Sequence, residues 1–215
     1  LYSDDITSSL IAAQTTFGIR VLGTTADGCL VKKSVDQTAA NYSAFPSVAW
    51  DAEVYDTDSY HDTVTNNSRI TIPAGANGKY GVLRFTANMT SVTASSQFLA
   101  ELSKNGAQFN GLGSCFSRIS AGVTEASINL MSAPVLLTTG DYFTVTLYNV
   151  DTSITVEAEK SAFSLEVLPS TLDGCLVYKS ADQTTANYSA GASIAFNSEL
   201  YDTQTLHDTG ANTER

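Results

Sequence analysis

KYGVLRFTANMT, residues 79–90, carries the strongest structural signal in the chain, because its side chains alternate in character from residue 83 onward. Apolar side chains fall on one side of an extended chain and polar ones on the other: Leu83, Phe85, Ala87 and Met89 against Arg84, Thr86 and Asn88. Successive side chains of a strand point to opposite faces, so this stretch is predicted to be a β-strand with one buried and one wet face. The same alternation predicts strands at residues 98–103, 142–148 and 163–167.

Turn-forming residues separate the expected strands at short intervals. They occur at residues 73–75, 77–78, 105–106, 111–113 and 140–141, each of which contains glycine. An Asn-Gly pair adopts the positive φ angles of a tight hairpin, and no window of about 12 residues shows a helical stripe. About eight to ten strands in a unit of roughly 145 residues predict an all-β fold with two packed antiparallel sheets, a jelly-roll sandwich.

The chain contains a long internal repeat. Residues 1–69 align with residues 147–215 without a gap, at a period of 146 residues from Cys29 to Cys175 (175 − 29 = 146). DGCLVKKSVDQTAANYS in the first copy matches DGCLVYKSADQTTANYS in the second. Solenoid repeats are about 20 to 50 residues long and cannot bury a core alone, so a period of this length corresponds to a whole domain.

The repeat divides the chain into three parts, with boundaries where Pro, Ser and Thr interrupt the strand pattern. We expect the C-terminal strands of a preceding jelly-roll domain, a complete domain and the N-terminal part of a following one, at residues 1–25, 27–170 and 173–215. A linker of about five residues leaves little freedom, so consecutive domains are expected to keep a fixed relation along a rod. The whole molecule is expected to be longer than this chain.

Each repeating unit carries two cysteines, Cys29 and Cys115 in the complete copy. A disulfide between them would suit an extracellular protein, whereas two buried thiols are the other interpretation. The sequence leaves both open.

Charge and composition exclude two classes of partner. The formal net charge is −11, and the eleven Lys and Arg residues are scattered. Binding to nucleic acid requires clustered basic residues, so no nucleic-acid partner is expected. No apolar run is long enough for a membrane helix, so no membrane insertion is expected either.

The densest group of ionisable residues lies between two expected strands: Asp51, Glu53, Asp56, Asp58, His61 and Asp62. The second copy keeps Glu199, Asp202, His207 and Asp208 but replaces the other two carboxylates by Asn197 and Gln204. A Ca²⁺ site at Glu53, Asp56 and Asp62 is one interpretation, although the spacing is not that of a calcium loop. The other is that His61, Asp62 and Arg69 anchor a long loop to the sheet by hydrogen bonds.

Catalysis has little support in this sequence. His61 is the one histidine of the complete unit, and neither a Ser nor a Cys in a recognisable nucleophile setting accompanies it. No Gly-rich phosphate loop precedes a helix, and the cysteine spacing fits no zinc site. We therefore predict no enzyme activity, no catalytic residues and no cofactor.

Four landmarks in order resemble the jelly-roll heads of the first complement component and the tumour necrosis factor ligands. They are residues 73–88, 102–106, 136–143 and 161–165, which include the Asn-Gly hairpin and the Leu-Leu-Thr-Thr-Gly-Asp strand. The opening segment departs from the animal heads and is similar to versions of this domain in bacteriophage virion proteins. The matching phrases lie at residues 31–37, 50–57, 61–63 and 66–69.

This resemblance implies a homotrimer, since such heads pack three-fold through one flat sheet face. Leu99, Tyr142 and Tyr148 fall on the nominally wet side of their strands and are the interface candidates. Aromatic-rich patches of this kind are typical of subunit interfaces.

The resemblance further implies a structural and adhesive module of a phage fibre, spike or capsid appendage, located in the virion or outside the cell. Its partners would be other copies of itself, other virion proteins, and a glycan or protein of the host surface. Loops at residues 105–114 and 120–126 are the expected contact regions, because loops vary without harming the sheets. A bacterial extracellular filament or adhesin is the alternative, and a secreted enzyme is a third hypothesis.

Overall fold

A computed structural model describes the complete unit almost throughout. The described residues are 27–40, 47–91, 97–108, 114–118, 125–149, 153–168, 174–178, 194–202, 205–207 and 210. The strands expected within residues 1–25 lie outside this set. Most residues of the two loops predicted to contact partners, at 105–114 and 120–126, also lie outside it. No helix among the described residues has the length and hydropathy needed to cross a membrane.

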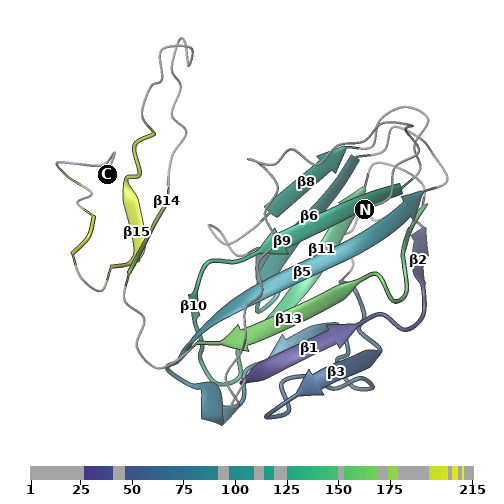
Figure 1. The fold of residues 1–215 in the computed structure, drawn as a ribbon, viewed down its shortest axis with the longest axis horizontal. Helices are drawn as coiled ribbons and strands as arrows, with labels where there is room; N and C mark the ends of the chain where they lie inside the picture. Colours follow the sequence, from purple (N-terminus) through teal and green to yellow (C-terminus); the bar gives the residue numbers. More distant parts are fainter. Residues whose placement is uncertain are drawn as a thin grey trace, which may run out of the picture.

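The first sheet, sheet A, contains eight antiparallel strands. They are β1 (Gly28–Lys32), β2 (Gln37–Ala40), β3 (Ala52–Asp56), β5 (Tyr80–Ser91), β9 (Glu125–Met131), β10 (Val135–Leu136), β12 (Ser153–Val156) and β13 (Ala162–Val167). Their order is β2-β12-β5-β13-β1-β3, and β9 and β10 also pair with β5. Figure 1 shows β9, β5, β13, β1 and β3 side by side in one layer.

The second sheet, sheet B, contains five antiparallel strands. They are β4 (Arg69–Thr71), β6 (Gln97–Lys104), β7 (Ala107–Gln108), β8 (Ser114–Arg118) and β11 (Tyr142–Asn149). Their order is β4-β11-β6-β7, with β8 pairing with β6. Two antiparallel sheets with crossing connections form a jelly-roll sandwich, so the predicted fold class is confirmed.

The core lies between the two sheets and contains the apolar side of each predicted strand. The buried side chains of sheet A include Leu83, Phe85, Ala87, Met89, Phe163 and Leu165, and those of sheet B include Ala100, Leu102, Phe143, Val145 and Leu147. Trp50 is fully buried between these layers, with its ring centroid 5.9 Å from that of Phe163 and 6.1 Å from that of Phe85. The alternation read from the sequence therefore assigns these strand faces correctly.

The hairpin turn predicted from the sequence is present in the structure, but the number of strands differs from the prediction. Asn105 and Gly106 both have positive φ angles, 54° and 77°, as the hairpin between β6 and β7 requires. The described part of the unit has thirteen strands instead of the expected eight to ten. The excess arises because β4, β7 and β10 are only two or three residues long, too short for a periodic pattern.

Cys29 is a free thiol, fully buried in the sandwich. Burial raises the pKa of this thiol, and the neighbouring Asp56 carboxylate raises it further. The buried-thiol interpretation therefore applies at Cys29 instead of the disulfide.

The second copy of the repeat forms a two-stranded sheet, β14 (Cys175–Tyr178) and β15 (Ser198–Asp202). Its register is that of β1 and β3 displaced by 146 residues, since Cys29 pairs with Asp56 and Cys175 with Asp202. Both pairs have a bulge at the same place, between Leu30 and Val31 and between Leu176 and Val177. The local structure of the two copies agrees, while the division into three domains stays a prediction.

Candidate functional site

The segment at residues 57–68, here called the edge loop, closes one side of the sandwich. It runs from β3, the edge strand of sheet A, to β4, the edge strand of sheet B. Tyr60 and His61 are buried within it. The Thr71 amide donates to the Tyr60 carbonyl at 2.7 Å, and the Trp50 amide donates to the Asn67 carbonyl at 2.7 Å. These bonds connect the edge loop to both the core and sheet B.

His61 lies at the centre of the edge loop with its side chain 0% exposed. Its Nδ1 lies 3.1 Å from Glu53 Oε1, and its Nε2 lies 3.1 Å from the carbonyl oxygen of Asn67. Both partners are acceptors, so the ring can donate to both only when each nitrogen carries a proton. The hydrogen-bonding partners of both ring nitrogens thus lie inside the protein, and the tautomer decides which nitrogen donates.

Asp56 and Asp62 accept hydrogen bonds from the backbone of the edge loop. Asp56 accepts from the amides of Asp58 and Tyr60 at Oδ1, at 3.3 and 3.0 Å, and from the His61 amide at Oδ2, at 2.9 Å. Asp62 Oδ1 accepts from the amides of Thr65 and Val64, at 2.9 and 2.8 Å, and these bonds lower the pKa of Asp62. Loop anchoring by His61 and Asp62 stays a prediction, and these are the contacts through which it would act.

The second copy repeats this network. His207 Nδ1 lies 2.9 Å from Glu199 Oε1, and the amides of Leu206 and His207 each donate to Asp202 at 3.0 Å. The four residues correspond to His61, Glu53, Tyr60 and Asp56 at the repeat period. Three of the four are identical in both copies, and Leu206, in place of Tyr60, contributes only its backbone amide. These bonds form although Asn197 and Gln204 replace Asp51 and Asp58.

Arg69 contacts the edge loop through its backbone and β11 through its side chain. Its amide donates to the Asn66 carbonyl at 3.1 Å, but its guanidinium lies over the Tyr142 ring, 4.8 Å from the centroid. The Nε atom is buried and has no hydrogen-bond partner among the described residues. The side chain therefore connects β4 to β11 by stacking on Tyr142, while its role in anchoring the loop stays a prediction.

The carboxylates predicted as possible calcium ligands form hydrogen bonds with groups of the protein. Glu53 faces His61, Asp56 faces three amides, and Asp62 faces two further along the loop. Within the described ranges, no group of three or more His, Cys, Asp or Glu side chains is arranged to hold a metal ion. In this structure Asp56 and Asp62 hydrogen-bond to the loop backbone, and Glu53 hydrogen-bonds to the His61 ring.

Asp27 joins the edge loop to the beginning of β5. Its Oδ1 accepts from the Tyr60 hydroxyl at 2.6 Å, and its Oδ2 lies 2.9 Å from Lys79 Nζ. Partial burial acts to raise the pKa of Asp27, but the hydrogen bonds from Tyr60 and Lys79 and the charge of Lys79 outweigh it, and the pKa falls below its usual value of 3.8. Folding thus favours the ionised form.

The free energy of unfolding is therefore expected to depend on pH through Asp27. A carboxyl whose pKa is lower in the folded state stabilises the fold fully above its unfolded pKa, and this stabilisation is lost as the pH falls through the folded pKa. Urea titrations at pH 6 and at pH about 3 should show a smaller acid-induced loss for Asp27→Asn than for the wild type. Equal losses would mean that Asp27 does not contribute.

The three interface candidates occupy two separate places on the outer side of sheet B. Leu99 and Tyr148 lie directly opposite each other in β6 and β11, and both are half-buried. Tyr142 lies near the other end of β11, beneath Arg69. Their role in an interface stays a prediction.

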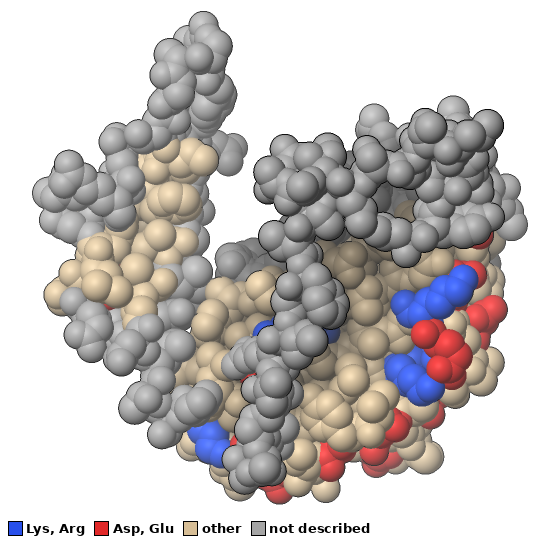
Figure 2. Space-filling view, viewed as in Figure 1, with Lys and Arg blue, Asp and Glu red and all other residues tan. Residues whose placement is uncertain are grey.

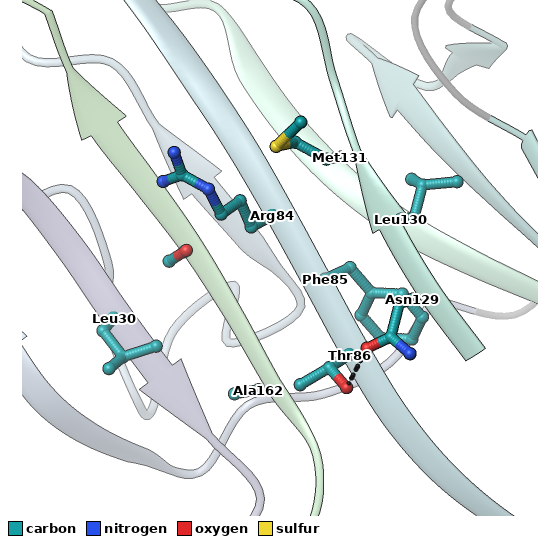
Figure 3. A pocket seen from close by; sticks show the side chains of 9 residues that line it. Leu30, Arg84, Phe85, Thr86, Asn129, Leu130, Met131 and Ala162 are labelled. Atoms are coloured by element: carbon teal, nitrogen blue, oxygen red, sulfur yellow. Dashed lines mark hydrogen bonds between the residues drawn. The ribbon is translucent and has the colours of Figure 1, made fainter. Parts of the chain in front are cut away.

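The outer side of sheet A carries a feature that the sequence did not reveal. A hollow of about 390 Å³ lies between side chains of β1, β5, β9 and β13. We call this surface the open face and define it by the outward-pointing side chains that line the hollow: Leu30, Arg84, Thr86, Asn129, Met131, Ala162 and Ser164. Figure 3 shows them around the hollow, with the Thr86 hydroxyl bonded to Asn129. Met131 is 65% exposed.

The open face is nearly free of unbalanced charge. Its one basic residue, Arg84, donates through Nη1 to Glu166 Oε2 at 2.7 Å, and the Glu166 side chain is only 12% exposed. In Figure 2 the charged residues gather toward the edges of this side of the molecule, and the described middle is mostly uncharged. One feature of the sequence could have indicated the hollow. Ala162 and Ser164 are small residues on the outer side of β13, whose other residues are all larger.

Comparison with known proteins gives matches among solved structures alone. A scan against protein-family models and a search of curated proteins give no match. The chain is similar to Eiger TNF from S. frugiperda, with 14% identity and a TM-score of 0.46 over 69% of this chain and 96% of that one. It is similar to murine APRIL, with 11% identity and a TM-score of 0.49 over 67% of this chain and 100% of that one. It is also similar to the globular domain of zebrafish complement 1qA, with 13% identity and a TM-score of 0.43 over 67% of this chain and 98% of that one. The likeness concerns the fold, and the jelly-roll assignment rests on the two sheets described above.

Proposed function

We propose that this chain is a non-enzymatic structural and adhesive module that associates with copies of itself through the open face of sheet A. The observation that carries the proposal is the neutrality of that face in a chain of net charge −11. Copies of an acidic chain repel one another, so contact is most favourable where the charge is already balanced. An apolar hollow with an exposed methionine is the kind of surface that a subunit interface buries.

We propose a trimer as the assembled form, on the resemblance to trimeric jelly-roll heads. In a ring of three, each contact joins two different surfaces, one from each neighbour. The open face would supply one surface. Leu99, Tyr142 and Tyr148 on sheet B remain the predicted candidates for the other.

We propose further that the assembly belongs to the outside of a virus particle, as part of a phage fibre, spike or capsid appendage. Support comes from the phrases shared with phage virion proteins in residues 31–69 and from the repeat, which suits a rod of successive modules. The commitment of both His61 ring nitrogens to hydrogen bonds favours a structural role for the residue that a catalytic hypothesis would use. We include contact with a host glycan or protein through the loops at residues 105–114 and 120–126 in this proposal, because loops vary without harming the sheets.

The mass of the chain in solution tests the assembly. Sedimentation equilibrium at micromolar concentration should give three times the chain mass of 22.8 kDa. A mass of one chain across this range would refute self-association, and a mass of two chains would refute the trimer.

A further inference from the structure

A second hollow, polar in character, lies on the edge loop and away from the open face. Its volume is about 410 Å³. The side chains and backbone around it belong to Ser59, Tyr60, His61, Asp62, Thr65, Asn66, Arg69 and Thr71. Hydroxyl, amide, carboxylate and guanidinium groups thus surround one space, which we call the polar hollow.

Arg69 is unusual among the basic side chains that the structure describes. The others each lie within 4.0 Å of a carboxylate: Lys32 of Glu159, Lys33 of Asp51, Lys79 of Asp27, Arg84 of Glu166, Lys104 of Asp141 and Lys160 of Glu157. Arg69 has no such partner within the described part of the chain, although the chain carries twice as many acidic as basic residues. An unpaired cation in so acidic a protein indicates that its partner is an anion from outside.

The Arg69 guanidinium is also held in place. It lies over the Tyr142 ring, and its Nε is a buried donor without an acceptor among the described residues. Because Nε is buried, a ligand in the hollow can reach only the Nη groups, and the stacking on Tyr142 limits how far the guanidinium plane can turn. A fixed, planar guanidinium matches the geometry of a carboxylate better than a flexible ammonium would.

The rest of the polar hollow offers hydroxyl and amide groups. The side chains of Ser59, Thr65 and Asn66 make no hydrogen bond to another described residue. Asp62 uses one oxygen for the loop backbone, which leaves the other able to accept from a hydroxyl. These groups suit a ligand that carries several hydroxyls around a single negative charge.

We propose that the polar hollow binds a carboxylate-bearing saccharide, with the carboxylate on the Arg69 guanidinium. The sugar hydroxyls bond to Asp62, Thr65 and Asn66. An acidic peptide would satisfy Arg69 equally well but would leave the hydroxyl and amide groups without partners. The inference deepens the adhesive part of the proposed function and does not depend on how many chains associate.

Two sugars that differ only in the carboxylate provide the direct test. Methyl β-D-glucuronide and methyl β-D-glucoside are titrated against the complete chain, and binding is followed by saturation-transfer NMR of the sugar protons. We expect a dissociation constant in the millimolar range for the glucuronide, the weak affinity usual for one small ligand. The glucoside should bind at least about tenfold more weakly, because it lacks the charge-assisted bonds.

Three variants locate the site. Arg69→Gln should weaken glucuronide binding by about tenfold, and Thr65→Val, which keeps the side-chain shape, by a few-fold. Lys160→Gln removes the same charge from an exposed ion pair and should change nothing. If Arg69→Gln fails to fold, Thr65→Val still tests the site, because it leaves the stacking of Arg69 on Tyr142 intact.

Several outcomes would overturn the inference. Equal binding of the two sugars, or full affinity in Arg69→Gln, would refute the role of the guanidinium. Binding of N-acetylglutamate as tight as that of the glucuronide would refute the sugar assignment in favour of a plain carboxylate or peptide. The mass of the same samples by sedimentation reports separately on self-association, so a failure here is distinguishable from a failure of the proposed assembly.

Discussion

Replacing Phe163 by alanine is expected to lower the free energy of unfolding by about 3–5 kcal/mol, the range for removing a large buried aromatic side chain. Phe163 lies in the middle of sheet A, paired with Phe85 on one side and Val31 on the other. It is 0% exposed and its ring lies against Trp50. The closely packed neighbours can relax only partly into the space, so most of the lost packing energy is not recovered.

Urea denaturation followed by the fluorescence of Trp50, the single tryptophan of the sequence, measures this effect. The chain concentration must be equal for all variants, because association contributes to apparent stability. Thr139→Ala, in an exposed turn outside both the core and the open face, is the control and should change the value by no more than about 0.5 kcal/mol. A loss below about 1.5 kcal/mol in Phe163→Ala would contradict the assignment of Phe163 to the core.

Ala162→Glu is expected to fold normally but to prevent assembly, whereas Phe163→Ala affects folding itself. Ala162 lies beside Phe163 on the strand and lines the hollow of the open face, opposite Thr86. A glutamate there would place an unpaired negative charge inside each contact between acidic chains. Burying such a charge costs several kcal/mol, so the sedimentation mass should fall to that of one chain at micromolar concentration.

Thr139→Glu is the matched control for Ala162→Glu. Thr139 lies in an exposed turn, and its replacement adds the same charge to the chain. It should leave the assembled mass unchanged. If Ala162→Glu still assembles as the wild type does, the open face is not the contact surface, and the corresponding change at Leu99 on sheet B becomes the next test.

Much of the fold could be predicted from the sequence because the strands have a period of two. The inward sets in β5 and β13 contain only apolar residues, and turns such as Asn105-Gly106 require positive φ angles that few other pairs adopt. Strand order could not be predicted. β5 pairs with β13 and with β9, which lie far from it along the chain, and local alternation carries no information on such pairings.

The candidate sites were harder to predict for the same reason. The hollow of the open face exists because Ala162 and Ser164 lie beside Thr86 and Arg84, residues of a distant part of the sequence. The isolation of Arg69 was equally hidden, because a list of charges does not show which cations have partners. His61, Asp56 and Glu53 were recognisable as a group because they are close in sequence and recur in the second copy.

The pairing of β14 with β15 has a consequence for how the chain folds. The two strands have the register of β1 and β3, including the bulge, and they lie within about thirty residues of chain. Among the described residues they pair only with each other. Pairings over so short a span need only a small loop closure, whereas pairings between distant segments must wait for a larger one. The contact of β14 with β15 is therefore expected to form early, before strands that are far apart in the sequence pair with each other.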